Sequence, residues 1–124
     1  MCGIIILNGK GVKRMATYII VASFILFDII TGICKALYIG NFNSSVMREG
    51  GFHKASEILA VVGATLIEYS THYISLGVEV PVVNVVVVYI CVMEIISIIE
   101  NLATINPELE KLFKPYLEKL KDKE

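Results

Sequence analysis

Three long runs of apolar residues alternate with shorter polar segments along the chain. They cover Met15–Tyr38, Ala55–Leu76 and Val80–Ile99, which are 24, 22 and 20 residues long. At about 1.5 Å per residue, a helix of about 20 residues just covers a hydrocarbon core of about 30 Å. The pattern therefore predicts three transmembrane helices.

The third run also admits another interpretation. Val82–Tyr89 is rich in valine, which favours a buried strand of a soluble α/β protein. A strand typically has about 4–8 residues, however, and this apolar pattern continues to Ile99. A lone strand in lipid would leave backbone groups unsatisfied, while a helix bonds them internally. We therefore expect a helix here.

The segments between the runs have the composition of turns. Ile39–Lys54 contains several Gly, Asn and Ser residues, which predicts a polar loop. Gly77–Pro81 predicts a tight turn, and so short a connection would make the second and third helices antiparallel neighbours. Pro81 suits the first turn of a helix, where its missing N–H costs nothing.

The last segment has a different character. A helix start is predicted here, with Asn106 as the N-cap, Pro107 at the first helical position and Glu108 as an acid in the first turn. Pro115 interrupts the helical pattern, so we expect one kinked helix or two shorter ones. Such a tail could lie on the membrane surface, pack against a neighbouring subunit or remain a solvated end. The apolar positions of this amphipathic segment are Leu109, Leu112, Phe113, Tyr116, Leu117 and Leu120.

These elements predict an all-α membrane protein with three transmembrane helices and a cytoplasmic amphipathic helical tail. The organisation is a short N-terminal segment (1–14), a transmembrane region (15–105) and a charged tail (106–124). Basic residues before the first run resemble the start of a signal peptide. The run continues past Asp28 to Tyr38 without a suitable small-residue cleavage site, so we expect a retained span.

Composition supports lipid as the solvent of this chain. Hydrophobic residues make up 56% of the 124 residues, and the mean hydropathy is +0.72. So short a chain buries a smaller fraction of its surface than a large domain does, so a core alone does not account for this excess. The net charge of −1 points to no charged partner, and we expect no nucleic acid.

Basic residues near the spans predict the orientation. The first loop and the tail share one side and carry Arg48, Lys54 and five tail lysines. The amino terminus and the second turn share the other side and carry only Lys10, Lys13 and Arg14. The positive-inside rule then predicts the amino terminus outside and the carboxyl terminus in the cytoplasm.

Ionisable residues inside the apolar runs are the candidate functional residues. At the centre of a span each costs at least about 2.5–3.5 kcal/mol, so it should face protein or water. Their spacing places one polar edge on each helix. These edges could join helices, line an aqueous pore made by many copies, or relay protons. The candidates are Asp28, Thr31, Lys35, Glu57, Glu68, Glu94 and Ser97.

The predicted depths suggest pairings among these residues. Lys35 is expected to pair with Glu94 or Glu57 near the inner ends of the spans. Asp28 is expected level with Glu68, where two acids would not both ionise comfortably. Small residues four positions apart, which favour close helix packing, are Gly32 with Ala36 and Ala60 with Ala64.

No constellation for catalysis, cofactor binding or metal binding is visible. Cys2, Cys34 and Cys91 form neither a paired motif nor a disulfide framework. His53 and His72 lie too far apart to suggest a metal pair. We therefore expect no enzyme, no cofactor and no metal.

Several segments resemble the toxin-secretion/phage-lysis holin family. Phe27–Gly32 followed by Lys35 and Ala36 resembles the family's opening span. Phe42–Ser45, with the later Gly50–Gly51 and Lys54–Ala55, resembles its first loop, and Glu94–Asn101 followed by Pro107 resembles its last span and exit. The likeness covers about Phe27–Leu120, although Val61–Val92 matches only in hydrophobicity. Ala103–Asn106 departs from it, because a Gly-rich turn is expected there.

The resemblance implies a non-enzymatic protein of the bacterial cytoplasmic membrane. Such proteins assemble with copies of themselves and open lesions that release an endolysin or a toxin. The implied partners are the lipid bilayer, other copies of the chain and the cargo, together with an antiholin, which shares the fold and blocks the pore. Two alternatives remain at this stage. One is a non-lytic ion-conducting, proton-conducting or transporter-associated subunit that uses Asp28, Glu68 and Glu94, and the other is a scaffold that binds a partner through its tail.

Overall fold

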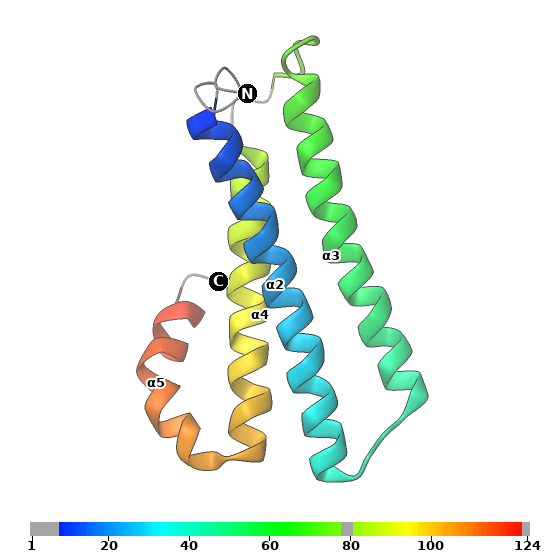
Figure 1. Cartoon of the computed structure of the whole chain (residues 1–124), viewed down its shortest axis with the longest axis vertical. Coiled ribbons are helices and arrows are strands. Elements are labelled where there is room, and N and C mark those ends of the chain that lie inside the picture. Colours follow the sequence, from blue (N-terminus) through cyan, green and yellow to red (C-terminus); the bar gives the residue numbers. More distant parts are fainter. Residues whose placement is uncertain (1–7, 78–80, 123–124) are drawn as a thin grey trace.

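The computed structural model describes residues 8–77 and 81–122, and this part of the chain is helical without strands (Figure 1). The helices are α2 (Asn8–Ile39), α3 (Ser44–Ser70), α4 (Val82–Ile105) and α5 (Pro107–Lys121). The all-α prediction is confirmed, and the strand interpretation of Val82–Tyr89 is wrong. Cys2, residues 78–80 of the predicted turn and residues 123–124 of the tail lie outside the described residues.

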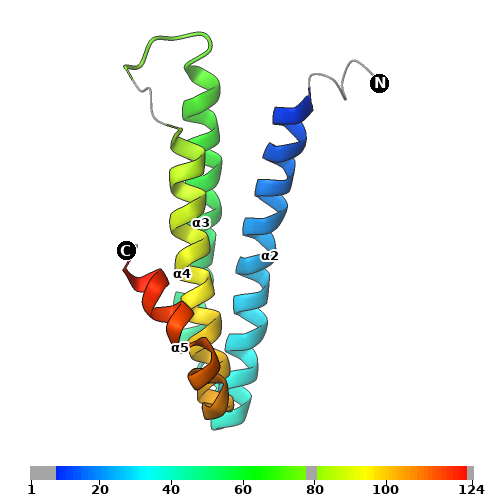
Figure 2. The same cartoon turned by 90° about the vertical axis from the view of Figure 1, so that its left-hand side faces the viewer.

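The central element of the structure is α4. The helices α2, α3 and α5 each pack against it. The chain descends through α2, returns through α3 and descends again through α4 (Figures 1 and 2). Figure 2 shows α2 diverging from the α3–α4 pair toward its amino-terminal end. In the view of Figure 1, α3 leans away from α4 toward the α2–α3 connection.

The helix α3 begins and ends earlier than the second apolar run, Ala55–Leu76, predicts. Most of the predicted loop Ile39–Lys54 is helical, and only residues 40–43 connect α2 to α3. The side chain of Asn43 accepts a hydrogen bond from the Ser45 N–H (2.9 Å) and caps α3. Gly40 makes the preceding turn with φ of +79°. The helix ends at Ser70, six residues before the predicted end at Leu76.

The boundary between α4 and α5 follows the predicted capping pattern. The Asn106 N–H bonds the Leu102 carbonyl at the end of α4 (2.8 Å), and its side chain accepts from the Glu108 N–H (3.2 Å). Pro107 occupies the start of α5. The α4 helix reaches Ile105, beyond the predicted end at Ile99, so Glu94 lies near its middle. Of the two predicted forms of the tail, the structure has one helix that continues through Pro115.

The bundle is polar in part of its interior and apolar over much of its surface. Beside an apolar core around Ile25, Ala64 and Val87, its buried residues include Asp28 and Glu94. Large apolar side chains on all three long helices are exposed. They include Leu26, Phe27 and Leu37 on α2, Leu59, Val62 and Leu66 on α3, and Val85, Val88 and Tyr89 on α4. This is the distribution expected of a protein surrounded by lipid, and it is the reverse of that in a soluble domain.

Two helices in the described part of the chain are long and apolar enough to span a membrane. They are the Lys13–Ile39 part of α2 and the whole of α4. The α3 helix falls outside this group because its 27 residues include six ionisable side chains, among them Lys54, Glu57 and Glu68. Two of the three predicted spans therefore have direct support.

Candidate functional site

One carboxylate from α2 and one from α4 converge on Lys54 of α3. Its ammonium Nζ donates hydrogen bonds to Oε1 (2.7 Å) and Oε2 (2.5 Å) of Glu94 and to Oδ2 of Asp28. A lysine ammonium has three N–H donors, so all of them are used. Lys54 therefore ties α3 to α2 and α4 at a single point.

The two carboxylates of these ion pairs are buried, and the Lys54 side chain is largely buried. Glu94 is 1% exposed and Asp28 is 6% exposed, while the Lys54 side chain is 16% exposed. A buried charge is tolerated when it is paired and hydrogen-bonded, and removing one partner leaves a costly isolated charge. The ion pairs are therefore a condition for this packing of the three helices.

Two neutral polar residues complete the contacts of Asp28. The Asn101 amide Nδ2 donates to Asp28 Oδ1 (3.0 Å) and to Thr31 Oγ1 (3.1 Å). The Thr31 hydroxyl donates to the Asp28 carbonyl (3.1 Å). Both carboxylate oxygens of Asp28 therefore have a donor. Asn101 extends the polar cluster toward the carboxyl end of α4, where its amide lies beside Gly32.

Glu57 and His53 link the cluster to the surface of the bundle. His53 Nε2 lies 2.9 Å from Glu57 Oε1, and the His53 side chain is 70% exposed. The second oxygen of Glu57, Oε2, is buried and has no hydrogen-bond partner among the described residues. The Glu57 carboxylate lies within hydrogen-bonding reach of Glu94. We call Asp28, His53, Lys54, Glu57, Glu94 and Asn101 the Lys54 cluster.

A second polar contact lies near the opposite end of the bundle. Arg14 on α2 pairs with Glu68 Oε2 (2.8 Å), and Glu68 Oε1 accepts the Val83 N–H (3.1 Å) at the start of α4. Near this end of the bundle, the hydroxyls of Tyr18 on α2 and Thr65 on α3 are 2.7 Å apart. Glu68 is thus separated from Asp28, and the expectation that these two acids lie level is wrong.

The sequence-derived polar candidates divide into three groups. Asp28, Thr31, Glu57 and Glu94 come together in or beside the Lys54 cluster, and Glu68 lies in the second contact. Lys35 and Ser97 are half-buried and take no part in either site. Of the small residues proposed for packing, Ala64 is buried, Gly32 and Ala36 are half-buried and Ala60 is exposed.

Lys54 is the buried cation, and the expectation that Lys35 would supply it is wrong. That expectation placed Lys54 in a loop, whereas α3 begins ten residues before it at Ser44. Two signals in the sequence point to the observed arrangement. Asn43 precedes Ser44 as a suitable N-cap. A stripe of residues three and four apart then marks one face of the helix: Lys54, Glu57, Val61, Ala64 and Glu68.

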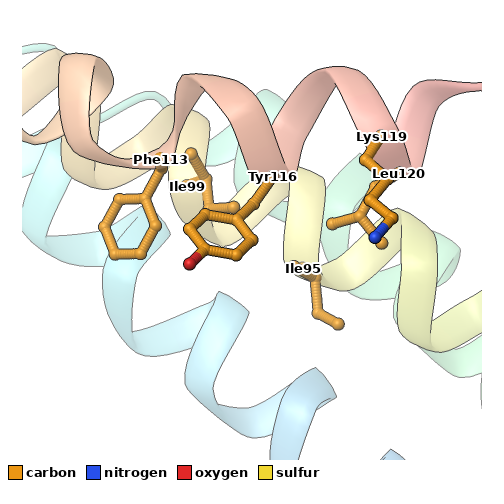
Figure 3. A pocket seen from close by; sticks show the side chains of 6 residues that line it. All are labelled: Ile95, Ile99, Phe113, Tyr116, Lys119 and Leu120. Carbon is orange, nitrogen blue, oxygen red and sulfur yellow. The ribbon is translucent and has the colours of Figure 1, made fainter.

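The tail helix folds back along α4. Figure 3 shows side chains of α5 and α4 that line an open cleft between the two helices. The cleft has a volume of about 520 Å³. At its edge Lys121 lies 3.9 Å from Glu100. In a single chain the amphipathic tail therefore packs on its own third helix. The cleft is lined by Ile95, Ile99, Phe113, Tyr116, Lys119 and Leu120.

The Lys54 cluster brings together three carboxyl groups, one ammonium, one imidazole and one amide. Two of its three carboxylates, Asp28 and Glu94, face the Lys54 ammonium. Across residues 8–77 and 81–122, no group of three or more His, Cys, Asp or Glu side chains is arranged to hold a metal ion. Its groups can shift protons among themselves, or separate when the helices move apart.

Comparison with known proteins agrees with this architecture. The model of the bacteriophage holin family matches residues 11–122, which include α3, α4, α5 and nearly all of α2. Searches of curated proteins and of solved structures found no significant match. The family is not a family of enzymes, and the resemblance found in the sequence is confirmed. The apolar helices α2 and α4 and the match over residues 11–122 together show that this chain is a membrane protein of the bacteriophage holin family.

Proposed function

We propose that the protein is a holin that gathers in the bacterial cytoplasmic membrane, assembles with copies of itself and opens a lesion for an endolysin or a toxin. The observation that carries the proposal is the inverted distribution of side chains. Glu94, at 1% exposed, is buried in the bundle, while Leu66 and Val88 are 63% and 58% exposed. A chain folded in this way is stable in lipid and holds charges that become favourable once water reaches them.

In this proposal α3 is the third membrane span. Its ionisable side chains would be costly against lipid, but Lys54, Glu57 and Glu68 all have partners or lie on its inward stripe. The same residues explain why hydropathy alone favours α2 and α4. With three spans, Arg48 and the tail lysines lie on the cytoplasmic side and Arg14 on the outer side.

The Lys54 cluster would control opening. In the closed bundle, hydrogen bonds and ion pairs offset the cost of burying its charges. In an assembly of several copies, the same polar edges could turn toward an aqueous lumen and regain their hydration. The two arrangements are alternatives because Lys54 cannot hold α2 and α4 together while the helices separate. Replacing a member of the cluster should therefore change the time of opening.

The experiment is inducible expression in bacteria while membrane potential, dye entry and release of a cytoplasmic enzyme are followed over time. The proposal expects accumulation without leakage, followed by a sudden loss of potential and by release of the enzyme. Release of the folded enzyme is the discriminating observation, because an endolysin or toxin needs an opening of that size. Loss of potential without enzyme release would contradict the holin proposal.

The buried carboxylates also favour one alternative, a non-lytic ion-conducting or proton-conducting subunit. Such a subunit would lower the membrane potential gradually and would retain cytoplasmic proteins. An antiholin would do neither by itself, and it would delay lysis by a co-expressed holin. The same time course therefore separates the three functions.

A further inference from the structure

One buried oxygen of the Lys54 cluster lacks the donor that its position requires. Glu57 is 9% exposed, so it is nine-tenths buried. Its Oε1 faces His53, and its Oε2 has no partner within the described part of the chain. Lys54 cannot supply the missing hydrogen bond, because its three donors are used by Asp28 and Glu94. An ionised Glu57 would therefore leave a buried, unsatisfied anion.

The charges around Glu57 point in the same direction. Asp28 on α2 and Glu94 on α4 already share the single ammonium of Lys54 on α3. The other titratable groups facing this region are His53 on α3 and the half-buried thiol of Cys91 on α4. Three ionised carboxylates would outnumber one ammonium by two charges in a largely buried space. A single bound proton removes one of them and turns Glu57 into a donor toward Glu94.

We propose that Glu57 and Glu94 hold one shared proton, carried on Oε2 of Glu57 in this arrangement, and that His53 is its route to water. The Glu57 carboxyl group neighbours that of Glu94, and its Oε1 contacts His53 at 2.9 Å. His53 is largely exposed and can exchange protons with water at one ring nitrogen. The carboxyl group of Glu57 then connects an exposed imidazole to the most buried acid of the bundle.

The shared proton has a defined effect on packing. With the proton bound, Glu57 donates to Glu94, and the charges of Asp28 and Glu94 face that of Lys54. Without it, Glu57 and Glu94 repel each other between α3 and α4. Proton loss therefore loosens the contact between these two helices, and proton binding tightens it.

Infrared spectroscopy of the full chain in lipid vesicles tests the bound proton without relying on lysis. At neutral pH exposed carboxylates are ionised, so a carbonyl stretch of a protonated carboxyl group reports a buried acid. We expect this band in the wild-type protein and its loss in Glu57→Gln. Glu49→Gln changes an exposed glutamate of the same helix and should leave the band unchanged. Absence of the band in wild type, or its full persistence in Glu57→Gln, would overturn the proposal.

Two further measurements keep the test independent of how well Glu57→Gln folds. Labelling glutamate side chains of the wild-type protein with ¹³C should shift the band, whereas an unshifted band would assign the proton to Asp28 and refute the proposal. After a rapid pH change, His53→Gln should slow the response of the band several-fold. His72→Gln, which alters an exposed histidine outside the Lys54 cluster, should respond at the wild-type rate. Equal rates in wild type and His53→Gln would exclude the His53 route.

Discussion

Lys54 and Glu94 are 40 residues apart in the sequence, and one ammonium donates to both oxygens of one carboxylate. The contact joins α3 to α4, which is the most apolar of the long helices. It forms because α3 begins at Ser44, which brings Lys54 level with the middle of α4. The arrangement predicts which substitutions destabilise the bundle and which leave it unchanged.

Replacing Lys54 should cost more stability than replacing any other lysine of the described chain. Lys54→Ala leaves Asp28 and Glu94 without a cation, and breaking a buried ion pair in this way typically costs about 3–5 kcal/mol. Lys35→Ala is the matched control, because Lys35 makes no ion pair within the described ranges. Thermal unfolding in detergent, followed by loss of helical circular dichroism, measures both. Equal midpoints for the two variants would contradict the assignment of Lys54 as the buried cation.

Asp28→Asn should preserve insertion and alter the time of lysis. The amide keeps the shape of Asp28 and one acceptor oxygen, but it removes a charge that faces Lys54. Membrane potential after induction gives the time of opening, and quantitative blotting checks that the variant accumulates normally. Glu49→Gln, which removes an exposed charge of α3, should follow the wild-type time course. If Asp28→Asn also follows it, the Asp28–Lys54 pair does not influence opening.

Cysteine labelling should show the loop between α2 and α3 on the cytoplasmic side. In a chain with Cys2, Cys34 and Cys91 replaced, Ser45→Cys should not react with a membrane-impermeant thiol reagent in intact cells. Ser75→Cys should react, because it lies in the exposed segment that follows α3. Ser75 is a better probe than Gly77, whose φ of +71° disfavours a side chain. Reaction at Ser45 and protection at Ser75 would reverse the proposed orientation.

The contact between α5 and α4 should depend on the aromatic residues of the cleft. Phe113→Ala removes part of the wall that faces Ile95 and Ile99. The tail should then be cleaved by trypsin several-fold faster at its lysines. Leu112→Ala is the control, because Leu112 is exposed on the same helix. Identical cleavage rates in Phe113→Ala and wild type would indicate that α5 is not held in this cleft.

The sequence predicted the helical class, the family and the polar character of the interior, because each depends on patterns local in the chain. Asp28, Glu57 and Glu94 were found since an ionisable residue in an apolar run needs a partner. The partners were missed where a helix boundary was misplaced. A loop over Ile39–Lys54 leaves Lys54 outside the bundle, so the sequence points to Lys35 as the cation. The expected depth of Asp28, level with Glu68, does not point to its contact with Asn101.

The contact of Arg14 with Glu68 could not be predicted from the sequence for a different reason. Both residues lie near helix ends, where a charge could equally face water or lipid headgroups. Their pairing depends on how far α2 and α3 diverge, and this tertiary feature leaves no pattern in either segment. Glu68 also accepts a hydrogen bond from the Val83 N–H, which lies in the first turn of α4.

We propose that the Lys54 cluster holds the closed bundle and that its disruption controls the opening of the lesion. The most direct measurement is release of a cytoplasmic enzyme over time from cells expressing wild type, Lys54→Ala, Asp28→Asn or Glu94→Gln at matched membrane levels. We expect sudden release in wild type and a clearly altered time of release in each variant. If all three variants accumulate normally and release the enzyme on the wild-type schedule, the cluster only joins the helices and does not control opening.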